Sequence, residues 1–167
     1  MRTILSVGWA LVLAVLVAGC EGPVGPPGPP GQDVAVQSFI VDFRMEDAVV
    51  DGVVASVQYD APEITSRVVQ SGIVMAYFRE QGTWTALPYT YGVESAELPA
   101  VDYTVTLGYA FEAGFLEVFY EASTDIVIDD LPDQTIKVVV IENLAGTRAA
   151  GVDLTDYNAV ANHYGLK

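Results

Sequence analysis

Cysteine and histidine are nearly absent from this chain of 167 residues. It has one cysteine, Cys20, and one histidine, His163. A single cysteine excludes an intramolecular disulfide. A zinc site would need carboxylates alone beside His163, which is an unusual ligand set. A Ser-His-Asp site would also depend on His163, which lies far along the chain from every serine. We therefore expect His163 to lie at the surface.

The signatures of common enzyme sites are also missing. The sequence contains no Gly-x-Ser-x-Gly turn, no phosphate-binding loop and no dinucleotide fingerprint. We expect no catalytic residues, no cofactor and no bound metal, and therefore a protein that is not an enzyme.

Basic residues are scarce. Seven Lys and Arg side chains stand against 22 Asp and Glu, which gives a formal net charge of −15. Such an acidic surface repels phosphate backbones, so nucleic acid is excluded as an expected partner. The same charge keeps a protein soluble and discourages nonspecific association.

The longest apolar run is too short to cross a membrane. Ile4 to Ala18 spans 15 residues, broken only by Ser6 and Gly8, whereas a spanning helix needs about 20. With Arg2 before it, the run is typical of the apolar region of a secretory signal peptide.

The signal ends in Val17-Ala18-Gly19-Cys20, which resembles the lipobox of bacterial lipoproteins. The resemblance implies cleavage between Gly19 and Cys20 and a diacylglycerol thioether on Cys20. Two or more acyl chains anchor a protein firmly, so we expect an exported protein held at the cell envelope, at the outer membrane. The alternative is an ordinary secretory signal, which would leave Cys20 as an exposed free thiol.

Glycine recurs at every third position after the cysteine. Four Gly-X-Y triplets in register begin at Gly22, Gly25, Gly28 and Gly31, and this repeat with proline is typical of polyproline II and collagen-like chains. One interpretation is a trimerising stalk. The other, which we favour because four triplets form few interchain hydrogen bonds, is a stiff single-chain spacer of roughly 3 Å per residue. We expect a monomer in solution and leave open a homotrimer on the membrane.

The order of a lipobox cysteine, Gly-Pro triplets and a Val- and Tyr-rich domain resembles a group of bacterial collagen-like lipoproteins. The likeness continues in three later segments, Gly72-Ile-Val-Met-Ala-Tyr, Trp84-Thr-Ala-Leu-Pro-Tyr-Thr and Ile136-Lys-Val-Val-Val-Ile. The resemblance implies a signal peptide over 1–19, a lipidated spacer over 20–33 and a β domain over 34–167. It implies no chemistry.

The residues after the spacer alternate between apolar and polar, as strands with one buried face do. Tyr103–Phe111 and Phe115–Glu121 form a predicted hairpin around Glu112-Ala113-Gly114. A second hairpin is expected at Gln81-Gly82, joining Ile73–Arg79 to Thr83–Tyr91. Ile136–Ile141 is apolar on both faces except for Lys137, which predicts a central strand. With further strands at Val36–Phe43 and Val53–Tyr59, the sequence predicts a mainly β protein, an antiparallel β-sandwich of about seven strands.

One or two short helices are expected in addition. Pro62 suits a first helical position and Gly72 suits the stop of the same helix. Near the end of the chain, Asp153 can cap a helix that Gly165 ends.

Two groups of residues are candidate ligand sites. Trp84, Tyr89 and Tyr91 fall on one predicted strand and could stack on sugar rings, although alternation places Trp84 on the opposite face. We expect Trp84 and Tyr91 to be largely buried instead. A cluster of carboxylates could bind calcium, but we favour a solvated acidic loop and leave calcium open; its members are Asp125, Asp129, Asp130 and Asp133.

The sequence thus predicts a membrane-anchored envelope lipoprotein whose β domain is non-enzymatic and serves structure or protein contacts. The alternative is a β-sandwich that binds a glycan or small ligand at the cell envelope.

Overall fold

The computed structural model describes residues 35–94, 102–125, 128, 131–142 and 151–166. Cys20 and the Gly-Pro triplets lie outside the described residues, and so do Asp129 and Asp130. Residues Gly31–Lys167 form one compact unit, and the described part of this unit has its own hydrophobic core. A unit with its own core is expected to fold independently.

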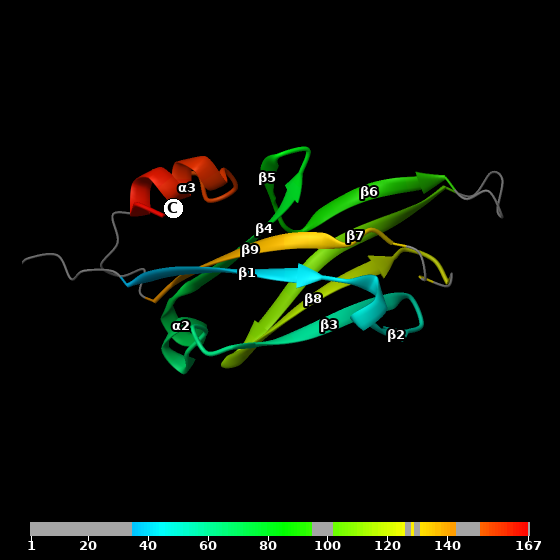
Figure 1. The fold of residues 1–167 in the computed structure, drawn as a ribbon, viewed down its shortest axis with the longest axis horizontal. Coiled ribbons are helices and arrows are strands. Elements are labelled where there is room, and N and C mark those ends of the chain that lie inside the picture. The colour runs from blue at the N-terminus through cyan, green and yellow to red at the C-terminus, as the bar shows by residue number, and fades with distance from the viewer. Residues whose placement is uncertain (1–34, 95–101, 126–127, 129–130, 143–150, 167) are drawn as a thin grey trace, which may run out of the picture. The chain divides into compact units, whose positions relative to one another are not determined.

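Two antiparallel sheets make up this domain, as Figure 1 shows. The four-stranded sheet has the order β1-β9-β4-β5, with β1 at Val36–Phe43, β9 at Gln134–Ile141, β4 at Ile73–Glu80 and β5 at Thr83–Ala86. The five-stranded sheet has the order β2-β3-β8-β7-β6, with β2 at Val49–Asp51, β3 at Val54–Ala61, β8 at Gly114–Ala122, β7 at Asp102–Glu112 and β6 at Tyr89–Glu94. The predicted antiparallel sandwich is confirmed, with nine strands in the described residues instead of about seven.

The core lies between the sheets and follows the predicted alternation. Val105 and Leu107 on β7 are each 1% exposed, and on β8 Leu116 and Val118 are fully buried. Burying one such side chain contributes about 1.5–3 kcal/mol. The rings of Phe43 on β1 and Tyr120 on β8 meet edge to face, with centroids 5.2 Å apart, and so join the two sheets.

The prediction that Ile136–Ile141 forms a central strand is also confirmed. β9 pairs with β1 on one side and with β4 on the other. Its inner face packs into the core, and its outer face, with Val139 and Ile141, packs with the helix α3 at Tyr157–Tyr164. Both faces of the strand are therefore covered, which explains why its apolar residues do not alternate with polar ones.

The helix α3 is held on the outer face by polar and aromatic contacts. The Tyr77 hydroxyl donates to the Leu154 carbonyl at 2.6 Å, and the Lys137 ammonium donates to the Tyr157 hydroxyl at 3.0 Å. Lys137 Nζ also lies 5.1 Å from the centre of the Trp84 ring, in cation–π range. Among the described residues, no helix has the length and apolar character needed to cross a membrane.

The prediction of one strand over Thr83–Tyr91 is wrong. β5 ends at Ala86 in the four-stranded sheet, and β6 begins at Tyr89 in the five-stranded sheet. The chain crosses between the sheets through the cis peptide Leu87–Pro88. Pro88 has no N–H group to contribute to a strand ladder, which is the physical reason that one continuous strand is disfavoured here.

Both predicted hairpins are present. Gln81 and Gly82 have φ values of 47° and 88°, the left-handed pair that a tight two-residue turn requires. The other turn, Glu112-Ala113-Gly114, closes on the pair Glu112 and Phe115.

The helix starts differ from the expectations, whereas the stops agree. Pro62 does not begin a helix. The helix α2 spans Ser66–Ser71, and the Thr65 hydroxyl caps it by accepting from the Val68 N–H at 3.3 Å. Gly72 follows α2 as predicted.

In α3 the cap is Asp156, which accepts from the Asn158 N–H at 2.8 Å, and not Asp153. Asp153 instead accepts from the hydroxyl and the N–H of Thr155, which lowers the pKa of its carboxyl group. Gly165, with φ of 67°, ends this helix as predicted.

Candidate functional site

A cleft of about 580 Å³ lies between the two sheets, where β4 ends and β6 begins. This volume is in the usual range for small-ligand sites, about 300–1,000 Å³. β4 and β9 of one sheet and β6, β7 and β8 of the other contribute to its lining. We call it the inter-sheet cleft. It lies where the chain leaves the four-stranded sheet after β5 and enters the five-stranded sheet at β6.

One wall of the inter-sheet cleft is a row of aromatic rings. The ring centroids of Phe78 and Tyr89 are 5.0 Å apart, and those of Tyr89 and Tyr91 are 6.1 Å apart. Leu107 and Tyr120 contribute further lining and are each 1% exposed, so they form the floor. The interior is therefore mostly apolar and suited to a planar or aliphatic group.

Two tyrosine hydroxyls in the lining differ in their partners. The Tyr120 hydroxyl donates to the Pro132 carbonyl at 3.0 Å. The Tyr91 hydroxyl oxygen is buried and has no hydrogen-bond partner among the described residues. Burial raises the pKa of both phenols, so both remain neutral. A buried polar group without a partner is rare in folded proteins, so Tyr91 is a notable feature of this wall.

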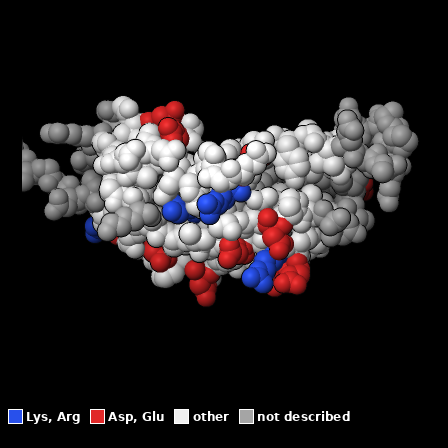
Figure 2. Space-filling model, turned by 45° about the horizontal axis from the view of Figure 1, so that its top comes forward, with Lys and Arg blue, Asp and Glu red and all other residues white. Residues whose placement is uncertain are grey.

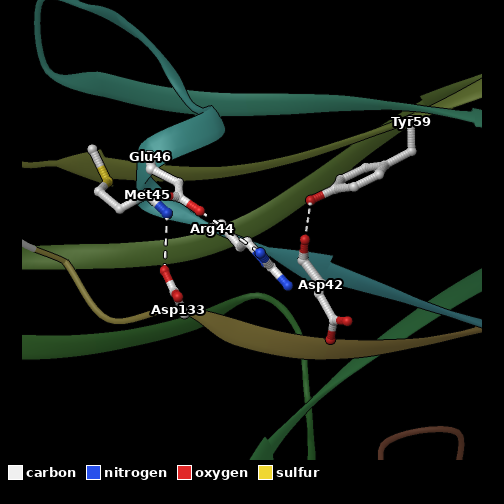
Figure 3. Close-up of polar contacts among 6 residues, drawn as sticks. All are labelled: Asp42, Arg44, Met45, Glu46, Tyr59 and Asp133. Carbon is white, nitrogen blue, oxygen red and sulfur yellow. Dashed lines mark hydrogen bonds and ion pairs between the residues drawn. The ribbon is translucent and has the colours of Figure 1, made fainter.

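The wall opposite β6 is fixed at the start of β9, beside Gln134. Asp133 accepts from the Met45 N–H at 3.0 Å, and the backbone carbonyl of Asp42 accepts from the Tyr59 hydroxyl at 3.0 Å, as Figure 3 shows. On the other side of Gln134, the Thr135 hydroxyl donates to the Asp42 carboxylate at 2.9 Å. The position of Gln134 in the cleft is therefore held by contacts on both sides.

The hydrogen bond from the Met45 N–H gives Asp133 a structural task. A hollow of about 200 Å³ adjoins it, lined also by Asp42 and Arg44. The described residues contain no group of three His, Cys, Asp or Glu side chains that could hold a metal ion. Asp129 and Asp130 lie outside them.

The structure brings together two of the three predicted ligand residues. Tyr89 and Tyr91 line the inter-sheet cleft, whereas Trp84 packs on the outer face against Tyr157, with ring centroids 5.7 Å apart. Trp84 and Tyr91 are both partly buried, so the expectation of extensive burial holds in part. His163 is exposed, as predicted.

Sequence reasoning missed the rest of the cleft. Phe78, Leu107, Tyr120 and Gln134 come from four other strands, and only the order of strands in the two sheets brings them together. The one available signal was Pro88, which separates the aromatic residues of β6 from Trp84 on β5.

Charged groups stand at the margin of the cleft. Arg79 and Glu80 both contribute to the lining, and both are exposed. On the face drawn in Figure 2, acidic side chains lie mainly along one edge, and uncharged residues cover most of the surface. The described lining therefore offers no buried charge to a ligand.

No protein-family model, curated protein or solved structure matches the chain.

Proposed function

We propose that this protein is a membrane-anchored envelope lipoprotein whose β-sandwich is non-enzymatic and serves structure or protein contacts. The observation that carries the proposal is the sequence Val17-Ala18-Gly19-Cys20 at the end of a 15-residue apolar run. The Gly-Pro triplets that follow would act as a stiff spacer between the lipid and the domain.

β1 places the first described strand residue far from the cleft. It begins at Val36, which pairs with Ile141, and ends at Phe43, which pairs with Gln134 in the cleft lining. A strand of this length spans roughly 25 Å, so Val36 and the inter-sheet cleft are at opposite ends of β1.

A second candidate function is the binding of a small ligand, and the inter-sheet cleft favours it. The cleft has the volume of a ligand site, an aromatic wall and a buried phenol oxygen, on Tyr91, that has no partner among the described residues. Protein contacts alone give no reason for a concave apolar site between the sheets.

Lipid anchoring is tested by expressing the full chain in a bacterium with an alkyne-tagged fatty acid. The wild-type protein should fractionate with membranes, carry the tag and show the mass of the acyl groups. Cys20→Ser should carry no tag and should leave the membrane or remain unprocessed. Ser38→Ala is the matched control, because Ser38 is exposed on β1, and it should be tagged like the wild type. A mature wild-type protein without acyl mass would overturn the proposed anchor.

A further inference from the structure

We propose that the inter-sheet cleft binds an uncharged, mostly apolar small molecule that carries a hydrogen-bonding oxygen. The inference rests on the small-ligand function proposed above and specifies the chemistry of the ligand. It does not depend on the lipid anchor.

The apolar character of the ligand follows from the cleft interior. Phe78, Leu107 and Tyr120 are between 1% and 5% exposed and form its deepest part. Aromatic surfaces of this kind attract planar and aliphatic groups by burial of apolar area. A ligand that enters the cleft would therefore bury apolar surface along its whole length, and this burial favours binding.

The absence of charge on the ligand follows from the placement of the ionic groups. Arg79 and Glu80 contribute to the lining but are both exposed, and the Arg79 guanidinium lies 5.8 Å from the centre of the Trp84 ring, on the outer face. A charged group that entered the interior would lose its hydration and meet no buried counter-charge among the described lining residues. Binding of an ion inside the cleft is therefore disfavoured.

The oxygen on the ligand follows from Tyr91. Its buried hydroxyl has no partner among the described residues, and a neutral phenol can both donate and accept. The oxygen is closed to solvent in the free chain, so a ligand must displace the ring or its neighbour Tyr89 slightly to reach it. A carbonyl, ether or hydroxyl oxygen of the ligand would then supply the missing partner.

A glycan fits this interior less well. Each sugar ring carries several hydroxyl groups, and a buried group without a partner costs about 1–3 kcal/mol. Tyr89, Tyr91 and Gln134 are the partly buried lining residues with polar side chains that could serve them, because the Tyr120 hydroxyl already bonds Pro132. Trp84, the largest aromatic surface among the predicted sugar-stacking residues, lies outside the cleft.

The test uses the mature chain from residue 20 with Cys20→Ser, since a lipid or detergent would dissolve the probe. The probe is Nile red, an uncharged planar dye with a carbonyl oxygen, titrated by fluorescence. Saturable binding of one dye per chain is expected. Val93→Trp, which fills the cleft from β6, should weaken the binding at least tenfold.

Two matched variants isolate the Tyr91 hydroxyl. Tyr91→Phe should weaken Nile red binding about 3- to 10-fold, the usual effect of one lost hydrogen bond. Tyr164→Phe is the control, because the Tyr164 hydroxyl is also buried without a partner among the described residues but lies on α3, away from the cleft lining. It should leave the affinity within twofold of the wild type. Circular dichroism and thermal unfolding verify that each variant is folded.

The outcomes separate the ligand class from the binding function. Equal affinity in folded Val93→Trp would place the dye elsewhere and overturn the proposal, and equal affinity in Tyr91→Phe would overturn the hydrogen-bonding oxygen. The wild type could fail to bind Nile red but bind cellotetraose in calorimetry, with that binding abolished in Val93→Trp. In that case the proposed ligand class is wrong, while the cleft remains a binding site. If neither probe binds, both the class and the small-ligand function fail.

Discussion

Gly72, between α2 and β4, provides a sharp test of the packing. Gly72→Ala and Gly92→Ala should change the free energy of unfolding in opposite directions. The φ and ψ of Gly72 are −99° and −170°, a backbone conformation that alanine adopts freely. Only space therefore decides the effect of Gly72→Ala. The added Cβ would lie 2.8 Å from Val68 Cα and 2.9 Å from the Val68 carbonyl oxygen, and still closer to the carbonyl oxygen of Ile141.

The cost of Gly72→Ala can be worked out from these contacts. Overpacking typically costs about 1–3 kcal/mol. The atoms that the new Cβ would meet are backbone atoms of Val68 on α2 and Ile141 on β9, which cannot rotate away as a side chain can, so we expect a cost near ~3 kcal/mol. The lower entropy of the unfolded chain offsets about 0.4–1 kcal/mol. The free energy of unfolding should therefore fall by about 2 kcal/mol, and the melting temperature by roughly 6–10 °C for a domain of this size.

Gly92→Ala is the matched control. Gly92 is on β6, and a Cβ built there has no atom within 4 Å. The change should raise the free energy of unfolding by about 0.4–1 kcal/mol. Urea unfolding followed by circular dichroism measures both variants, with an unchanged dependence on denaturant as the test that only stability has changed. If the two variants differ by less than 0.5 kcal/mol, the close approach of α2 to β9 described here is wrong.

Three further predictions concern the environment of Trp84, the tyrosines and the oligomeric state. In the chain that starts at residue 20, as the proposed signal cleavage would leave it, Trp84 is the one tryptophan. Acrylamide should quench its fluorescence well below the level of free tryptophan, and equal quenching would contradict its packing against Tyr157. Burial raises the pKa of Tyr59 to about 12 and raises the pKa values of Tyr77 and Tyr120. The unfolded chain therefore loses these protons from about pH 10, before the folded chain does, so stability is lost as the pH rises from about 10 toward 12. The urea midpoint should be lower at pH 11 than at pH 9, and a constant midpoint would refute the burial. The fragment from Gln32 should be monomeric by light scattering in moderate salt, and restoring Gly22–Gly31 without lipid should not change that. If the fragment with Gly22–Gly31 is a trimer and the fragment from Gln32 is a monomer, the Gly-Pro stalk trimerises by itself.

The strands could be predicted because alternation is local. Val36–Phe43 has the observed bounds of β1, and the turn at Glu112-Ala113-Gly114 was readable from the residues on either side. β2 escaped prediction because three residues, Val49–Asp51, are too few to show a period of two. The cap of α3 was misplaced because Asp153 and Asp156 are chemically identical candidates, and only the backbone path decides between them.

The cleft could be predicted only in part, because it depends on strand order. Tyr89 and Tyr91 are two apart on one strand, so their shared face was readable from the sequence. That they face Phe78 and Tyr120 depends on which sheet each strand joins and on where the sheets separate. These are nonlocal outcomes of packing, and a pattern within a short window does not contain them.

The central position of β9 determines the order in which the four-stranded sheet can form. Val36 on β1 pairs with Ile141 on β9, 105 residues later in the chain. β4 pairs with β9 too, so β1 and β4 lack their common partner until the chain has been made as far as Ile141. Closing so long a loop is slow, whereas the hairpin of β7 and β8 closes over two residues, Ala113 and Gly114, and can form early. Insertion of β9 is therefore a late event that joins the first strand of the domain to the rest, and until then the apolar edges of β1 and β4 are open to pairing with another chain.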